Sequence, residues 1–147
     1  MEYKLEGQRE LVVAFAKLDG DMSKALETAA MAGALIVQNG AKEKAPILTG
    51  TLSRSIHMET TVKTPEKAVV QVGTDVVYAA IQEFGGIIHA KNKPYLVFKT
   101  ADGAWHSVES VQIPAHPYMR PALDNNIEKI KGEMKAAFAQ VVKAAVK

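Results

Sequence analysis

Three short segments rich in turn-forming residues divide this 147-residue chain, and they constrain its fold more than any other feature. They cover residues 45–56, residues 72–74 with 78–86, and residues 114–124. Each combines Gly or Pro with Thr, Ser or Asp, the residue types that occupy turns and helix caps. None of them has the residue spacing of an active site. Such segments are typical of the joints between helices and strands in a small α+β domain.

Helical periodicity dominates the chain before the first of these segments. Apolar residues between positions 5 and 18 recur at helical spacing, and Gly20 is expected to end this first short helix. Asp21 is expected to cap a second helix over residues 22–44, which Pro46 stops. Small residues in its apolar stripe should let another element approach closely. The stripe expected to be buried is Met22, Leu26, Ala29, Gly33, Ile36 and Val37.

Two hairpins are predicted in the middle of the chain. Residues 55–64 and 68–72 are rich in β-branched residues and flank a Pro-Glu-Lys turn. Residues 95–100 and 105–113 flank the pair Asp102-Gly103, which is a strong local signal for a hairpin. Together they predict an antiparallel sheet of about four strands.

Two more helices complete the predicted fold. Residues 78–84 read as a short helix stopped by Gly85-Gly86. The C-terminal region reads as one long amphipathic helix with Pro121 in its first turn and Asp124 near its positive N-terminal end. Its expected apolar face is Leu123, Ile127, Ile130, Met134, Phe138 or Ala137, Val141 and Ala145. The predicted fold is a single α+β domain over residues 1–147, with the sheet packed against a long N-terminal-half helix and a long C-terminal helix.

Composition excludes several classes of function. Eighteen Lys plus Arg against sixteen Asp plus Glu give a charge of +2, too small to predict a surface that binds nucleic acid directly. The chain has no cysteine, which excludes disulfides, thiolate zinc sites and cysteine nucleophiles. Its N-terminus lacks the pattern of a signal peptide, and no stretch approaches the roughly 20 apolar residues of a membrane span. We expect a product in the soluble cytoplasm.

Candidate chemistry is sparse. The four histidines (His57, His89, His106 and His116) do not have the spacing of metal ligands on one helix face, and no metal or cofactor is expected. Gly85-Gly86 and Thr49-Gly50 lack the spacing of phosphate-binding loops. They are interpreted as turn glycines.

Glu83 is the carboxylate with the strongest claim to a special role, because it precedes an aromatic residue and two glycines. With His89 or His116 it could form an acid–base pair. The alternative is that its oxygens accept hydrogen bonds from backbone amides of a neighbouring loop. The alternative is preferred, since no nucleophile or second carboxylate is placed with recognisable spacing. Arg54 and Arg120 could each contact carboxylates of a neighbouring subunit or tie down their own loops, and both interpretations stay open.

From roughly residue 26 to roughly residue 130, the chain resembles the neck proteins of long-tailed bacteriophages, a head–tail connector family of tail-component or tail-completion type. Four short motifs carry the resemblance. In that family a Thr-Gly-x-Leu-x-x-Ser-Ile motif starts the first strand, and a Val-Gly-Thr motif closes a strand. A Tyr-Ala-x-x-x-Glu-Phe-Gly motif forms a helix end, and a stretch like Pro-Tyr-Met-Arg-Pro-Ala-Leu starts the C-terminal helix. The matching residues are Thr49, Gly50, Leu52, Ser55 and Ile56; Gly73 and Thr74; Tyr78, Ala79, Glu83, Phe84 and Gly85; and Pro117, Pro121 and Ala122.

The resemblance implies a non-enzymatic virion component, made in the host cytoplasm and located at the junction of head and tail. It implies a ring of roughly six or twelve identical copies. The implied neighbours are portal or adaptor, head-closure, and tail-completion or tail-terminator proteins, with genomic DNA passing nearby without specific binding and no membrane contact. Tail terminator and head-closure roles are alternatives within this class. Alternatives of other classes are a small acid–base enzyme using Glu83 with His89 or His116, and a soluble host-interaction module encoded by a prophage.

Overall fold

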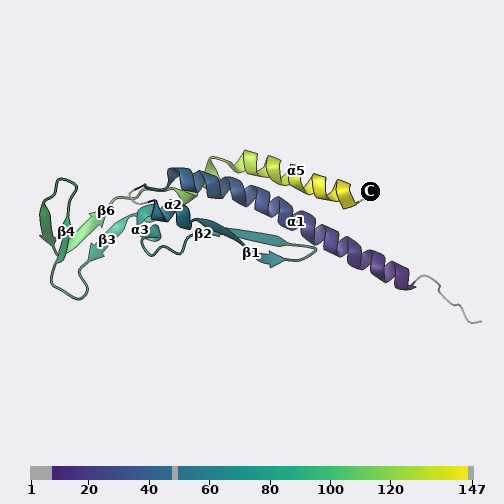
Figure 1. Cartoon of the computed structure of the whole chain (residues 1–147), viewed down its shortest axis with the longest axis horizontal. Coiled ribbons are helices and arrows are strands. Elements are labelled where there is room, and N and C mark those ends of the chain that lie inside the picture. The colour runs from purple at the N-terminus through teal and green to yellow at the C-terminus, as the bar shows by residue number, and fades with distance from the viewer. Residues whose placement is uncertain (1–7, 48–49, 146–147) are drawn as a thin grey trace, which may run out of the picture.

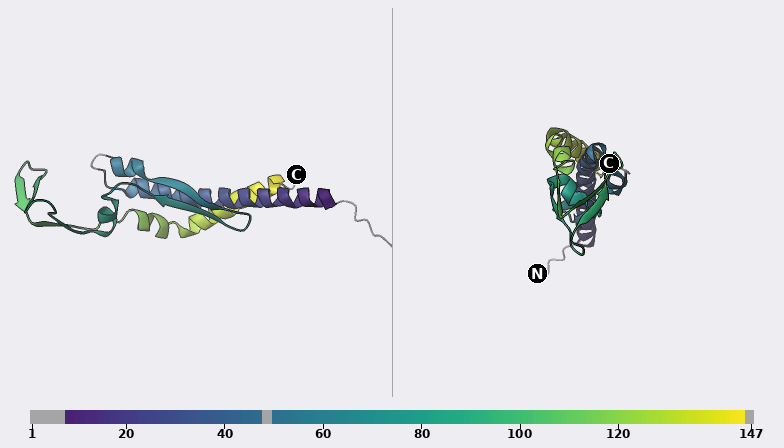
Figure 2. Two further views of the ribbon diagram at one scale, coloured as in Figure 1. Left: turned by 90° about the horizontal axis from the view of Figure 1, so that it is seen from below. Right: turned by 90° about the vertical axis from the view of Figure 1, so that its left-hand side faces the viewer.

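The protein, seen here as a computed structural model that describes residues 8–47 and 50–145, is elongated and has two parts (Figure 1). The first part, the body, contains every helix of the described residues and one hairpin. The second part, the arm, is a narrow two-stranded extension that leaves the body at one end (Figure 2). Helices and antiparallel strands are both present, so the predicted α+β class is confirmed. No helix in the described ranges is both long enough and apolar enough to cross a membrane.

One helix, α1 (Gln8–Lys44), runs the length of the body. The prediction of two helices separated at Gly20 is wrong, because α1 continues through that residue without a positive φ. A glycine inside a helix costs about 1 kcal/mol, and the good helix formers on both sides outweigh that cost. Residues 5–7 of the first predicted helix lie outside the described residues. The predicted stop is confirmed, since α1 ends at Lys44 just before Ala45-Pro46.

The C-terminal region lies antiparallel along α1, but it is not one helix as predicted. It forms α4 (Met119–Asp124) and α5 (Ile127–Ala145), with a break at Asn125 and Asn126. Asn126 donates its side-chain amide to the carbonyl of Ala122 at 2.9 Å, and such local bonds compete with helix continuation. Asp124 therefore ends α4 and does not stand at the start of a long helix, whereas Pro121 lies in the first turn of α4.

Gly33 explains how closely α1 and α5 approach each other. A Cβ atom at this position would lie 3.0 Å from Ile130 Cγ2 and 3.0 Å from Met134 Cγ. The helix pair therefore uses the missing side chain as contact space. By contrast, a Cβ at Gly20 would have nothing within 4 Å.

We expect Gly33→Leu to reduce the free energy of unfolding by about 1–3 kcal/mol, because the added atoms overpack the α1–α5 contact. The control is Gly20→Ala in the same helix, which should stabilise by about 0.5–1 kcal/mol because alanine has the better helix propensity and meets no neighbour. Urea unfolding followed by far-UV circular dichroism measures both. Equal effects of the two substitutions would contradict the assigned contact.

A hairpin covers another side of α1. Strands β1 (His57–Lys63) and β2 (Ala68–Gly73) pair antiparallel with His57 opposite Gly73, which confirms the first predicted hairpin. An ion pair of 2.6 Å between Lys63 Nζ and Glu27 Oε2 fastens its far end to α1. The motif that ends at Ile56 does not begin a strand as the resemblance implied. Residues 51–55 form the short helix α2 (Thr51–Ser55), and β1 starts only after it.

The arm is built from four short strands that form two successive ladders. Strand β3 (Gly86–His89) pairs with β6 (Ser110–Ile113), and β4 (Leu96–Lys99) pairs with β5 (Trp105–Val108). The predicted Asp-Gly hairpin is confirmed, with Gly103 at φ 87°. The expected single sheet of about four strands is not found: the described strands form three two-stranded sheets. Residues 105–113 are two strands interrupted at Glu109, and β3 was not predicted.

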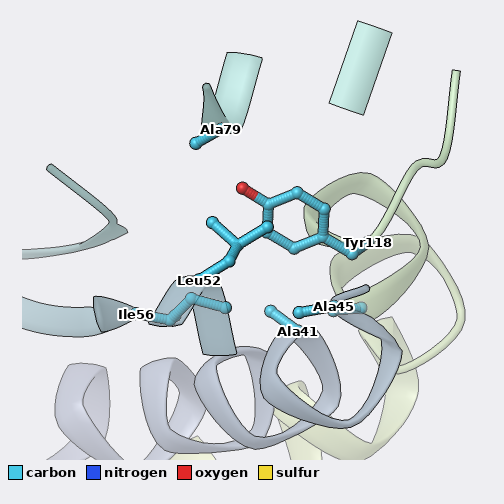
Figure 3. Close-up of a cluster of buried hydrophobic side chains, with 7 residues drawn as sticks. Ala41, Ala45, Leu52, Ile56, Ala79 and Tyr118 are labelled. Carbon is cyan, nitrogen blue, oxygen red and sulfur yellow. The ribbon is translucent and has the colours of Figure 1, made fainter. Parts of the chain in front are cut away.

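The buried core lies where the C-terminal end of α1 meets α2, α4 and α3 (Ala79–Phe84). Its largest fully buried side chains are Tyr118 and Ile56 (Figure 3). The cluster consists of Ala41, Ala45, Leu52, Ile56, Ala79, Tyr118 and Ala122. We call this cluster, with the three turn-rich segments around it, the joint, because the arm begins here.

Candidate functional site

The structure brings the three turn-rich segments together at the joint. Ser55 of the first segment and Thr74 of the second share a hydrogen bond of 2.6 Å between their hydroxyl groups. The second and third segments are connected through Glu83 and the backbone of residues 118–120. Segments that are far apart in sequence therefore form one structural unit.

Glu83 is held by backbone amides. Its Oε2 accepts hydrogen bonds from the backbone N–H of Tyr118 at 2.7 Å and of Met119 at 2.9 Å, and its Oε1 accepts one from Arg120 at 3.0 Å. These amides belong to the first turn of α4 and the residue before it, and they have no partner within that helix. The carboxylate, only 8% exposed, thus caps α4 across a separation of about 35 residues.

The pKa of Glu83 reflects this position. Burial acts to raise it, but the three backbone hydrogen bonds and the nearby charge of Arg120 together lower the pKa below its ordinary value of 4.5. Burial, and after it the negative charge of the Glu83 carboxylate, raise the pKa of the neighbouring Tyr118 hydroxyl. Glu83 is therefore ionised at neutral pH.

This geometry gives no support to an acid–base pair. A carboxyl group with a lowered pKa is a weak general base and is not protonated to act as a general acid at neutral pH. His89 lies out on β3 opposite Ser110, and the side chain of His116 is exposed while its backbone N–H donates to Gln82 at 2.7 Å. Among the residues that the structure describes, no group of three His, Asp or Glu side chains could hold a metal ion.

Glu83→Gln is expected to lower the free energy of unfolding by about 2–3 kcal/mol at pH 7, because charge-assisted bonds are lost and the amide group opposes the backbone N–H donors. The folded-state pKa is depressed, so this contribution is full above pH 4.5 and is lost as pH falls through the lower folded value. The stability gap between wild type and variant should thus be constant from pH 8 to about pH 5.5 and shrink at more acidic pH.

The control for this measurement is Glu66→Gln, at an exposed carboxylate in the β1–β2 turn. It should change stability by less than about 0.5 kcal/mol across the same range. Chemical denaturation at each pH gives both curves. A gap for Glu83→Gln that widens with acid would contradict the assigned hydrogen bonds.

Gly85 fixes where the arm leaves the body. Its φ of 68° and ψ of −174° lie in a region that side chains rarely adopt, and it donates its N–H to the carbonyl of Ile81 at 2.9 Å. A Cβ at this position would lie 2.8 Å from the backbone N of Ala115 and 2.9 Å from the carbonyl oxygen of Ile113. The two strands that enter and leave the arm are therefore in direct backbone contact at its root.

The other motif residues are distributed around the joint. Leu52 is buried, Gly50 precedes α2 with φ 70°, and Pro121 lies in α4. Arg54 and Arg120 are both exposed, and Arg120 adds its charge to the surroundings of Glu83. Gly73 ends β2, Tyr78 precedes α3, Phe84 ends α3 on the surface, and Pro117 is exposed just before Tyr118. Thr49 lies outside the described residues.

A long apolar groove opens beside the joint. It consists of two hollows of about 530 Å³ and about 440 Å³ that share Val37, Val72 and Leu123 in their linings, so they are parts of one depression. Helix α1 forms its floor, β2 one wall, and α4 with α5 the other. At the end near the joint α3 also lines the groove, and the charged side chains of Glu83, Arg120 and Asp124 belong to the lining there. In the hollow farther from the arm, none of the described lining residues has a charged or polar side chain.

The arm carries an unusual number of exposed apolar side chains. Trp105, at 71% exposure, and Val97, at 64%, lie on the same face near its tip. The large apolar side chains exposed along the arm are Ile87, Ile88, Tyr95, Val97 and Trp105. Exposed apolar surfaces of this kind are typical of sites that contact other proteins.

Sequence reasoning did not identify this groove or this face of the arm. The signal for the arm was present, since a tryptophan directly follows the Asp-Gly turn in a hairpin with alternating apolar residues. The groove has no such local signal, because its walls come from segments far apart in the chain.

Comparison with known proteins addresses the class of this molecule. Residues 9–85, just over half of the chain, match the family described as "Bacteriophage HK97-gp10, putative tail-component". No curated protein and no solved structure matches the chain. The matched region covers α1, the β1–β2 hairpin and α3 up to Gly85, the residue that fixes the root of the arm. The chain belongs to the HK97-gp10-like family of phage tail components.

Proposed function

We propose that this chain is a structural protein of the phage head–tail junction, where identical copies form a ring that helps join the DNA-filled head to the tail. The observation that carries the proposal is the family match over α1, the first hairpin and α3. In this proposal residues 1–147 act as one neck domain, without cofactor and without catalysis.

The shape of the molecule supports an assembly role. Its exposed apolar arm and its apolar groove are both costly for an isolated chain in water and both useful in a contact between proteins. A repeated contact between two different surfaces of one chain closes into a ring when the rotation between copies allows it. Portal or adaptor proteins on one side, and head-closure, tail-completion or tail-terminator proteins on the other, are the proposed neighbours.

Cryo-electron microscopy of particles from a strain with a nonsense codon in this gene, beside wild-type particles, tests the proposal. We expect ring density that fits the body at the junction of wild-type particles, and filled heads with detached tails in the mutant. Density at the tail end of the junction would assign a tail terminator, and density on the portal side a head-closure protein. Intact tailed particles that lack the chain would overturn the proposal and return Glu83 to consideration as a catalytic group.

A further inference from the structure

The wall of the groove formed by β2 presents the free edge of a strand. Three consecutive residues, Ala68, Val69 and Val70, line the same hollow, although neighbouring residues of a strand point to opposite faces. The side of the strand, with its backbone groups, must therefore face the hollow. Strand β2 pairs only with β1 in the described part of the chain, so the other side has no strand partner. An edge of this kind is a template for an added strand.

The side chains around this edge select an apolar occupant. In the hollow farther from the arm, the lining includes Ala34 and Val37 on α1 and Ile130 and Met134 on α5. None of the described residues in this lining is charged. Leu123 stands at the boundary of the two hollows with 48% of its surface exposed. The hollow farther from the arm thus offers backbone hydrogen-bonding groups on one side and apolar side chains on the other two.

The arm has the complementary properties. Each of its ladders has two strands only, so every strand has a free edge. In the β4–β5 ladder, Val97 faces Ser107 and Lys99 faces Trp105, which places Val97 and Trp105 diagonally on one face. An isolated two-stranded hairpin is marginally stable in water, so the arm needs a surface to cover this face.

The arm does not reach the groove of its own chain as it stands. From the joint, the arm extends in one direction, while β2 and α5, which form the walls, extend in the other (Figure 1). The root is held by the backbone contact of Gly85 with Ile113 and Ala115, which opposes a reversal. An arm that fills the groove must therefore come from a second molecule.

The size of the arm suits a stable contact. It runs from Gly86 to Ile113, about 28 residues, and a standard interface uses roughly 20–30 residues and roughly 800 Å² on each side. Tryptophan is among the residues that most often dominate binding energy when they enter a pocket. The hollows, at about 530 and 440 Å³, are within the range of roughly 300–1,000 Å³ that encloses a drug-sized ligand, so each has room for a tryptophan side chain.

We propose that the tip of the arm of one copy docks in the groove of a second copy, adding a strand to the free edge of β2 and burying Trp105 against α1 and α5. This inference deepens the ring proposed above and rests on it. Because arm and groove are different surfaces, the contact is head to tail and leaves one free arm and one free groove at the ends of any open chain.

Trp105 provides the readout, since it is the only tryptophan in the sequence. In the wild type, its fluorescence emission should move to shorter wavelength with rising protein concentration, in parallel with the sedimentation coefficient. Trp105→Ser and Leu123→Lys should each weaken association by about thirtyfold or more, the effect of losing one dominant contact. Val77→Ser is the matched control, because Val77 is 98% exposed and lies outside the groove lining and the arm.

Mixing the two variants gives the decisive experiment. Trp105→Ser has an intact groove and Leu123→Lys has an intact arm, so an equimolar mixture should form a heterodimer that grows no further. The emission of Trp105 from the Leu123→Lys copy should shift to shorter wavelength, although its partner has no tryptophan. Circular dichroism of each variant checks that it is folded.

Three outcomes would overturn the inference: a wild type that stays monomeric with exposed Trp105, a Trp105→Ser variant that assembles normally, or a mixture of folded variants that does not pair. Failure of the junction role is distinguishable. Particles that carry the chain at the junction in spite of Trp105→Ser would reject the arm contact alone. Variants that pair in solution while the chain is absent from particles would reject the junction role alone.

Discussion

Gly85→Val is expected to lower the free energy of unfolding by at least about 3 kcal/mol and to disrupt the root of the arm. Gly85 has φ 68° and ψ −174°, a conformation that costs a residue with a side chain about 1–3 kcal/mol. In addition, the new Cβ would approach backbone atoms of Ala115 and Ile113 to less than 3 Å. Backbone atoms cannot rotate away as a side chain can, so α3 and the residues before α4 must separate.

The matched control is Gly73→Ala at the end of β2. Gly73 has no positive φ, and a Cβ there would have nothing within 4 Å. Its effect should stay within about 1 kcal/mol. Far-UV circular dichroism during urea unfolding is the suitable measurement, because Trp105 is exposed in the arm and reports poorly on the body. A stable Gly85→Val protein with the melting temperature of wild type would show that the root is not fixed as described.

The elements that the sequence predicted well are those with strong local signals. Pro46 ends α1, the β-branched residues around Pro65 form the first hairpin, and Asp102-Gly103 forms the turn of the arm. Gly85 stops α3 with the positive φ that a glycine stop implies. In each case a few neighbouring residues determine the backbone, so no knowledge of distant contacts is needed.

The elements that the sequence did not predict depend on small energy differences or distant partners. Gly20 does not stop α1, because its cost of about 1 kcal/mol is less than the gain from continuing the helix. The break at Asn126 depends on one side-chain hydrogen bond to Ala122. Strand β3 is recognisable only through its pairing with β6, which lies more than 20 residues later in the chain.

The candidate site also has parts that local sequence predicts and parts that depend on distant partners. Glu83 was identified from its immediate neighbours, but its partners at Tyr118, Met119 and Arg120 are about 35 residues away and could not be named. The groove between β2 and α5 has no motif, since its walls come from segments that are far apart in the sequence. The sequence contains the apolar residues of such an interaction surface, but only the structure shows which of them stay exposed.

Tyr118→Ala is expected to produce the largest loss of stability in the body, about 3–5 kcal/mol. The ring is 1% exposed and packs between Leu52, Ala79 and the alanines at the C-terminal end of α1 (Figure 3). Four of the six other buried residues of this cluster are alanines, which have no flexible side chain to fill the space that the ring leaves. The lost contact energy and the remaining cavity therefore add.

Two further variants serve as controls. One separates the contribution of the Tyr118 ring from that of its hydroxyl group, and the other tests whether the loss of any tyrosine would have the same effect. Tyr118→Phe keeps the ring and should lose far less stability than Tyr118→Ala. Tyr95→Ala removes a ring that is half exposed in the arm, and it should change the free energy of unfolding of the body by less than about 0.5 kcal/mol.

The raised pKa of Tyr118 adds a pH test. Wild type should lose stability relative to Tyr118→Phe only as pH rises above about 10, where the hydroxyl ionises more readily in the unfolded chain. If Tyr118→Ala and Tyr95→Ala had equal effects, the core would not be centred on Tyr118, and the joint would have to be held by the Glu83 cap and the backbone contacts of Gly85 alone.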